Sequence, residues 1–180
     1  MTPSEAHDTA WKRDVGHDQM TIECRNLLEK RWARFSWRVE KDRREPHSLT
    51  GIWCEHFFVC EKGPRFFADI FAKWECEYES VHADHTSRGP VKRITAHSHA
   101  VYVAFEIKPQ IHSAGALLRQ VRVQRERLST WLGYKANTEI FVWPLVPADD
   151  PLLEIYIEMS GMSAITWDKS KQQITFRNPR

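Results

Sequence analysis

The segment 101–108, VYVAFEIK, constrains the fold of this chain more than any other. It is apolar and rich in β-branched and aromatic residues, which is typical of a buried strand. Side chains two positions apart share one face of a strand, so Glu106 and Lys108 point one way while Phe105 and Ile107 point the other. Because unpaired buried charge is costly, a buried strand that ends in a carboxylate and an ammonium indicates a functional site. The alternative is a surface ion pair at a strand end.

A helix is predicted directly after this strand. Ser113 is well placed to cap its start, and Gly133 is well placed to follow its end near Leu132. The expected buried stripe consists of Leu117, Leu118, Val121 and Leu128. Because this helix connects the strand at 101–108 to another predicted strand at 139–144, we expect those two strands to be parallel.

The whole pattern predicts an α/β fold with a mixed central β-sheet flanked by helices. A helix is expected at 17–35, and a C-terminal β-meander is expected from strands at 152–159, 165–167 and 172–176. Earlier strands are expected within 49–60, 65–80 and 91–96, separated by a polar loop at 81–90 and a turn at 97–99. With 180 residues, of which 42% are hydrophobic, the chain suits a single domain at 17–180 after a frayed segment at 1–16.

The segment 106–124, EIKPQIHSAGALLRQVRVQ, carries a family resemblance. Glu-x-Lys at a strand end, with Arg-Gln on the next helix, resembles the PD-(D/E)xK nuclease superfamily, whose members share the restriction-endonuclease-like fold. The resemblance covers roughly residues 22–144. It implies that Glu106 is a metal ligand, that Lys108 positions the attacking water, and that Gln120 supports the site. Many branches have Gln-x-x-x-Tyr here, whereas this chain has Gln124 in the Tyr place.

The second metal-binding acid is less well specified. A Mg²⁺ ion needs several oxygen ligands, and the family takes one from an Asp on a preceding strand. Asp69 is the first choice because it is the single acid in the apolar segment 65–72. Asp84, in a polar segment, is the alternative, and Glu75 and Glu77 stay open.

The expected function is therefore that of a metal-dependent DNA endonuclease, with Mg²⁺ or Mn²⁺ as cofactor and Asp69, Glu106, Lys108 and Gln120 as candidate catalytic residues. Arginines on the helix after Glu-x-Lys could contact the phosphate backbone, or they could be ordinary solvated charge. The candidates are Arg119, Arg122 and Arg125, with Arg127 expected to turn away from Arg119. The alternative function is a catalytically inactive nuclease-fold module that binds DNA or a protein partner, and a homodimer or larger complex is compatible with either.

Composition adds broader expectations. The formal net charge of +2 does not by itself indicate nucleic acid. Four cysteines without CxxC spacing, no signal peptide and no apolar run of membrane-spanning length favour free thiols in the cytoplasm. A zinc site is conceivable because several histidines and cysteines cluster, although their spacing matches no defined zinc pattern. These residues are His82, His85, His97, His99, Cys60 and Cys76.

Overall fold

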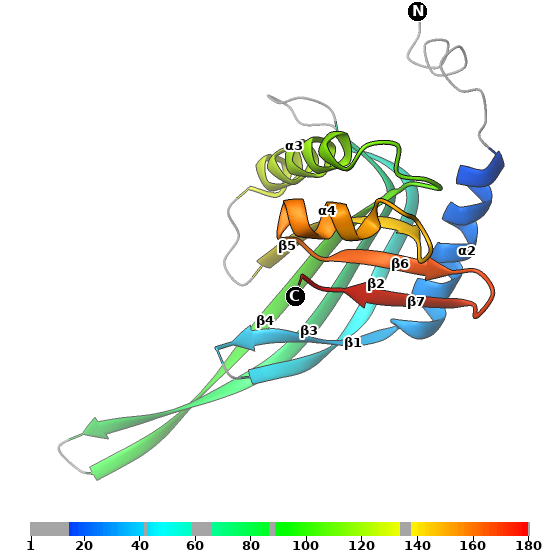
Figure 1. Cartoon of the computed structure of the whole chain (residues 1–180). Coiled ribbons are helices and arrows are strands. Elements are labelled where there is room, and N and C mark those ends of the chain that lie inside the picture. Colours follow the sequence, from blue (N-terminus) through cyan, green and yellow to red (C-terminus); the bar gives the residue numbers. More distant parts are fainter. Residues whose placement is uncertain (1–14, 42, 59–65, 87–88, 134–137, 180) are drawn as a thin grey trace, which may run out of the picture.

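A seven-stranded mixed β-sheet forms the centre of the molecule in the computed structural model, which describes residues 15–41, 43–58, 66–86, 89–133 and 138–179 (Figure 1). The strands are β1 (Arg34–Glu40), β2 (Arg43–Phe58), β3 (Phe66–Thr86), β4 (Gly89–Ile107), β5 (Thr138–Pro147), β6 (Ala164–Asp168) and β7 (Gln173–Arg177). They lie side by side in sequence order. The strands β1 to β4 are antiparallel, β4, β5 and β6 are parallel, and β7 is antiparallel to β6. The predicted mixed sheet flanked by helices is confirmed.

Helices lie on both sides of this sheet. Helix α2 (Val15–Arg31) lies on one side, while α3 (Ala114–Leu132) and α4 (Leu153–Ser160) lie together on the other (Figure 1). The buried apolar residues form two clusters, one beneath α2 and one beneath α3 and α4. In the α2 cluster, Trp37 of β1 stacks at 5.4 Å on Phe141 and at 5.7 Å on Trp143, both of β5. Since three strands separate β1 from β5 in the sheet, these contacts require the sheet to curl strongly.

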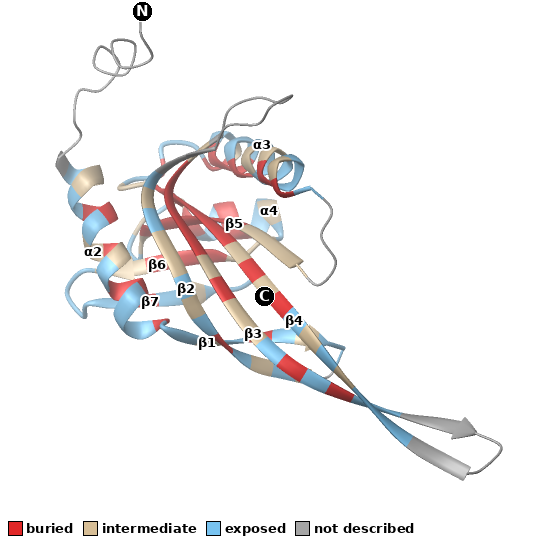
Figure 2. Cartoon of the chain, turned by 180° about the vertical axis from the view of Figure 1, so that it is seen from behind, coloured by how far each residue is buried: buried red, intermediate tan, exposed pale blue. Residues whose placement is uncertain are grey.

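The interior position of β4 is confirmed. Phe105 pairs with Ile70 of β3 on one side and with Trp143 of β5 on the other. Phe105 and Ile107 lie in the α2 cluster, whereas Ala104 lies in the α3 cluster. Burial along the centre of the sheet follows this arrangement (Figure 2).

The helix after β4 also has the predicted ends. The Ser113 hydroxyl accepts a hydrogen bond from the Ala116 N–H at 3.3 Å, which is the expected N-cap. Gly133 has φ 64°, a value that suits glycine, and its N–H donates to the Ser129 carbonyl at 3.1 Å. The helix connects β4 to β5, and these strands are parallel as predicted, with Val101 opposite Glu139.

The predicted C-terminal β-meander is wrong. Residues 153–160 form helix α4, and β6 with β7 forms only a hairpin. Leu153, Tyr156 and Ile157 are buried with the i, i+3, i+4 spacing of one helical face, and Gly161 follows with φ 60°. A short apolar run fits a strand or a helix equally well by sequence, and packing against α3 decides for the helix.

The polar loop at 81–90 and the turn at 97–99 are also wrong. Strand β3 continues to Thr86, and β4 starts at Gly89 and runs through 97–99, with Ser80 opposite Thr95 and His82 opposite Arg93; residues 87–88 lie outside the described part of the chain. The resulting hairpin projects from the body as an arm (Figures 1 and 2). Since both faces of an arm meet water, its sequence is polar and resembles a loop. The predicted frayed segment 1–16 lies mostly outside the described residues, and α2 begins at Val15.

Leu128 tests how α3 docks on the sheet. It is fully buried beneath the helix, so Leu128→Ala should lower the free energy of unfolding by about 2–5 kcal/mol through reduced burial and the cavity left behind. Urea unfolding would measure the decrease. Glu126→Ala on the exposed side of α3 is the control and should change stability by less than about 0.5 kcal/mol. Equal decreases in the two variants would contradict this docking.

Candidate active site

The candidate site lies where β3 and β4 separate. Their pairing runs from the arm to Ile70 opposite Phe105 and stops there, although β3 includes Asp69 and β4 continues to Ile107. The pairing of β3 with β2 is also interrupted at Asp69, opposite Glu55, whose φ of 50° distorts β2. Asp69 is therefore a residue that the ladder leaves unpaired on both sides.

The Asp69 side chain accepts a main-chain hydrogen bond that the interrupted β3–β4 ladder leaves without a carbonyl partner. Its Oδ2 accepts a hydrogen bond of 2.7 Å from the Ile107 N–H, a residue 38 positions away in sequence. Its Oδ1 lies 3.4 Å from Nε2 of His17 in the first turn of α2. The carboxylate, which is 6% exposed, thus joins β3 to β4 and to the start of α2.

Glu106 has three hydrogen-bond donors around its carboxylate. The Lys108 ammonium donates to Oε1 at 2.6 Å. The side-chain amide of Gln120 donates to the same oxygen, and that of Gln124 donates to Oε2. The predicted common face of Glu106 and Lys108 is therefore present, and it faces α3.

A negative charge on Glu106 is unfavourable beside the carboxylate of Asp69. Burial, and then repulsion from Asp69, raises the pKa of the Glu106 carboxyl above its ordinary value, although Lys108 and Gln124 oppose the shift. The neighbouring Asp69 also raises the pKa of His17 above its ordinary value, against the effect of burial. Asp69 and Glu106 are thus close enough to act on one another. Lys108 supplies a compensating positive charge, and Asp69 favours the protonated form of His17.

The alternative acids lie elsewhere. Asp84 is opposite Val91 near the end of the arm, and the fifteen residues from Val91 to Glu106 along β4 span about 50 Å. Glu75 is opposite Ala100 and forms an ion pair of 2.7 Å with Lys73. Asp69 is the candidate that the fold brings to Glu106.

Two residues near the carboxylates were not identified as site residues from sequence. His17 was interpreted only as the start of a helix, and Gln124 as a departure from the family pattern. Only the i, i+4 spacing of Gln120 and Gln124 hinted that both could reach one group. The nearness of His17 to Asp69 depends on how α2 docks, for which the sequence has no local signal.

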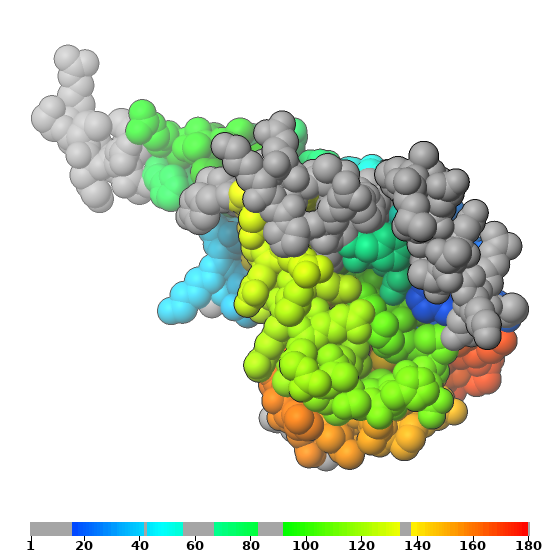
Figure 3. Space-filling view, turned by 90° about the horizontal axis from the view of Figure 1, so that it is seen from above, coloured from blue at the N-terminus to red at the C-terminus, as the bar shows by residue number. Residues whose placement is uncertain are grey.

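The arginines of α3 divide between two sides of the helix. Arg119, Arg122 and Arg125 are exposed, and Arg127 is half-buried. Arg122 lies close enough to Tyr156 of α4 to oppose the burial that raises the pKa of that phenol to about 12. Arg127 follows Gln124 by three residues, so it shares the side that faces Glu106. Figure 3 shows α3 (green to yellow) on the surface beside α4 (orange).

The donor chemistry of the site fits a hard divalent ion, because carboxylate oxygens are the ligands that Mg²⁺ and Mn²⁺ prefer. Asp69 and Glu106 would hold it. Among the described residues, however, no three His, Cys, Asp or Glu side chains are grouped as a formed metal centre. Ion binding at Glu106 must therefore replace hydrogen bonds from Lys108, Gln120 or Gln124.

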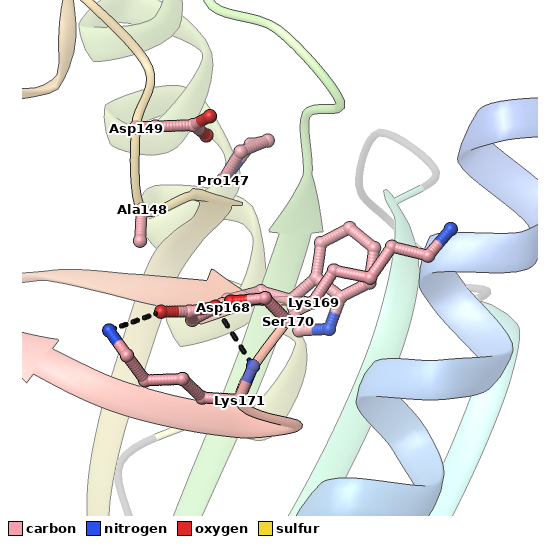
Figure 4. A pocket seen from close by; sticks show the side chains of 8 residues that line it. Pro147, Ala148, Asp149, Asp168, Lys169, Ser170 and Lys171 are labelled. Carbon is pink, nitrogen blue, oxygen red and sulfur yellow. Dashed lines mark hydrogen bonds and ion pairs between the residues drawn. The ribbon is translucent and has the colours of Figure 1, made fainter.

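A separate hollow of about 550 Å³ lies between the end of β5 and the β6–β7 turn (Figure 4). Two of its charged groups are paired, since Lys171 contacts Asp168 at 2.8 Å, and the Ser170 hydroxyl also donates to Asp168 at 2.6 Å. These contacts stabilise the turn between the strands. The hollow contains none of the predicted site residues.

Comparisons with protein-family models, curated proteins and solved structures find no match to this chain. Within the described part of the chain, no helix is both long and apolar enough to cross a membrane. The family resemblance therefore depends on the site residues themselves.

The coupling of the two carboxylates can be measured directly. Asp69→Asn removes a negative charge but keeps an oxygen to accept the Ile107 N–H, so it should lower the pKa of Glu106 and also that of His17. Carboxyl and imidazole NMR titrations would show both shifts, with Glu106→Gln assigning the carboxyl signal. Glu158→Gln, on the exposed side of α4, should leave both pKa values unchanged. Unaltered values in Asp69→Asn would mean that the carboxylates do not interact.

Proposed function

We propose that this protein is a metal-dependent nuclease that hydrolyses phosphodiester bonds in DNA, with Asp69, Glu106 and Lys108 at its active site. The observation that carries the proposal is the convergence of two buried carboxylates and an ammonium at the point where β3 and β4 separate. Ionisable groups with perturbed pKa values cluster at functional sites.

Each residue has a definite part in this proposal. A bound Mg²⁺ or Mn²⁺ would activate water and neutralise phosphate charge. Asp69 and Glu106 supply the oxygen ligands, and His17 orients Asp69 through its contact with Oδ1. Lys108, fixed by Glu106, holds a positive charge where the scissile phosphate develops negative charge. Gln120 and Gln124 orient Glu106 from α3.

The surface of α3 supports a nucleic-acid partner. Arg119, Arg122 and Arg125 project from its exposed surface, and Arg127 lies on the side of the two glutamines. Arginines suit phosphate oxygens because the guanidinium is always charged and presents several donors. A DNA backbone that runs along α3 into the site would pass Arg119 and Arg127 more closely than Arg122, which lies toward α4.

Cleavage should depend on both carboxylates and on the lysine. Asp69→Asn, Glu106→Gln and Lys108→Met should each reduce Mg²⁺- or Mn²⁺-dependent cleavage of DNA by roughly 100-fold or more. The assay follows strand breaks in single- and double-stranded DNA with and without EDTA. Glu158→Gln on the exposed side of α4 and Lys92→Met in the arm are the matched controls and should keep full activity. Undiminished cleavage in the Glu106→Gln variant would remove this site from the reaction.

Binding should depend on the arginines nearest the site. Arg119→Ala and Arg127→Ala should weaken DNA binding more than Arg122→Ala and Arg125→Ala. Removing an arginine that neutralises one phosphate should also reduce the slope of log K against log salt by about 0.9. Fluorescence anisotropy over a salt series measures both effects, with the Glu106→Gln variant as background to prevent cleavage. Equal weakening at all four positions would contradict a path along the side of α3 that faces Glu106.

The second candidate is a nuclease-fold module without catalysis that binds DNA or a protein partner. It is favoured by the hydrogen bonds that already occupy both oxygens of Glu106. The cleavage assay separates the two: binding to DNA without metal-dependent cleavage by the wild type would support the module.

A further inference from the structure

Three side chains of metal-binding type form a row across the middle strands, away from Glu106. They are His47 of β2, Cys76 of β3 and His99 of β4. Cys76 of β3 is opposite His99 of β4. Because Ser48 pairs with Glu75 and the strands are antiparallel, the preceding residue of β2, His47, lies opposite Cys76. Opposite residues on neighbouring strands project from the same face of a sheet, so the three side chains meet.

The donor atoms of this row are in contact. His47 Nε2 lies 2.7 Å from His99 Nδ1 and 3.2 Å from Cys76 Sγ. His47 is 0% exposed and His99 is 4% exposed, whereas Cys76 is only partly buried and leaves a route from solvent. Polar groups from three strands are thus concentrated at one buried point.

The tautomers of the two rings follow from their outer contacts. His47 Nδ1 lies 2.8 Å from the Glu45 carbonyl oxygen, which can only accept, so Nδ1 carries the hydrogen. With that hydrogen on Nδ1, the neutral His47 ring presents the lone pair of Nε2 toward His99 Nδ1 and Cys76 Sγ. His99 Nδ1 must then donate to it, which leaves His99 Nε2 bare.

The outer side of His99 faces Glu139. His99 Nε2 lies 3.9 Å from Glu139 Oε1, just beyond hydrogen-bond distance. If His99 Nδ1 bound a metal ion, its hydrogen would move to Nε2 and point at Glu139. Metal-binding histidines commonly have such a carboxylate or carbonyl partner on the other nitrogen. His47 has the Glu45 carbonyl, and Glu139 lies near the outer nitrogen of His99.

We propose that His47, Cys76 and His99 bind one Zn²⁺ or a related transition-metal ion through Nε2, Sγ and Nδ1, with water as the fourth ligand. Two nitrogens and one sulfur suit zinc rather than Mg²⁺. Two imidazole nitrogens on one zinc lie about 3.3 Å apart, so the ion would replace the present hydrogen bond and separate these atoms by about 0.6 Å. Among the described residues no metal-binding group is already formed, so binding requires this small separation.

The bound ion would join β2, β3 and β4 at the base of the arm. It would also be distinct from the proposed nuclease site, since His99 precedes Glu106 by seven residues on β4, about 23 Å along the strand. Stiffening the arm is the structural effect expected of such a cross-link. Cys60, which the sequence grouped with these donors, lies outside the described residues.

Binding should release one proton for each metal ion. Burial raises the pKa of the Cys76 thiol, so it is protonated at neutral pH, and a metal ligand must be thiolate. The hydrogen of His99 only moves from Nδ1 to Nε2, which adds no released proton. The apparent affinity should therefore fall about tenfold for each unit by which the pH is lowered.

Cobalt titration of the intact protein tests the site. Co²⁺ should bind with one-to-one stoichiometry and show a thiolate-to-cobalt charge-transfer band with visible bands typical of four-coordination, and Zn²⁺ should abolish both. Cys76→Ser should lose the charge-transfer band, and His99→Gln should weaken binding at least tenfold. Cys54→Ser, a cysteine of β2 outside the row, is the matched control and should retain the full spectrum.

X-ray absorption of the wild-type zinc complex avoids any doubt about folding of the variants. Two imidazole nitrogens and one sulfur bonded to zinc would support the site. A spectrum without sulfur, or a charge-transfer band that survives in Cys76→Ser, would overturn it. None of these measurements uses DNA cleavage, so failure of the nuclease proposal would leave this result standing.

Discussion

The pairing of β3 with β4 is the interaction on which the rest of this structure depends. It extends from the arm to Ile70 opposite Phe105. This pairing positions two groups of side chains, Cys76 with His99 and Asp69 with Glu106. Cys76 meets His99 within this ladder, and Asp69 reaches Ile107 where it ends. Since a slip of one residue would send every side chain of a strand to the other face, both groupings require this single register.

The place where the ladder ends is as important as the ladder itself. Separation of the strands frees the Ile107 N–H, and Asp69 accepts its hydrogen bond instead of a main-chain carbonyl. The carboxylates of Asp69 and Glu106 are then both buried, and Asp69 makes the ionised form of Glu106 less favourable. Lys108, His17 and two glutamines offset that cost, and such an arrangement is easier to understand at a reaction site than in a purely structural core.

The two groups of side chains along β3 and β4 therefore offer different metal-ligand atoms. Oxygen donors gather near α3, where Glu106 meets Gln120 and Gln124, and nitrogen and sulfur donors gather at the base of the arm. Hard ions and borderline ions prefer different ligands, so each group has its own expected partner. The strong curl of the sheet keeps β1 and α2 over one face while α3 and α4 cover the other.

Local signals in the sequence were enough to predict the centre of the fold. The strand that ends in Glu106, the Ser113 cap, the helix ended by Gly133 and the parallel β5 could all be predicted, because periodicity and capping act within a few residues. The common face of Lys108 and Glu106 followed from strand alternation, whereas Asp69 was chosen as the single acid in an apolar segment.

Tertiary structure decided what depends on distant partners. Residues 153–160 became a helix because α3 offers it a surface, and polar residues of the arm became strands because each has an antiparallel partner. His17 reaches Asp69 only through the docking of α2, and His47 joins His99, 52 positions away, only through strand register. Sequence alone determined which residues could serve each kind of chemistry, whereas long-range pairing determined which of them meet, because register and docking depend on the free energy of the whole fold rather than on any local segment.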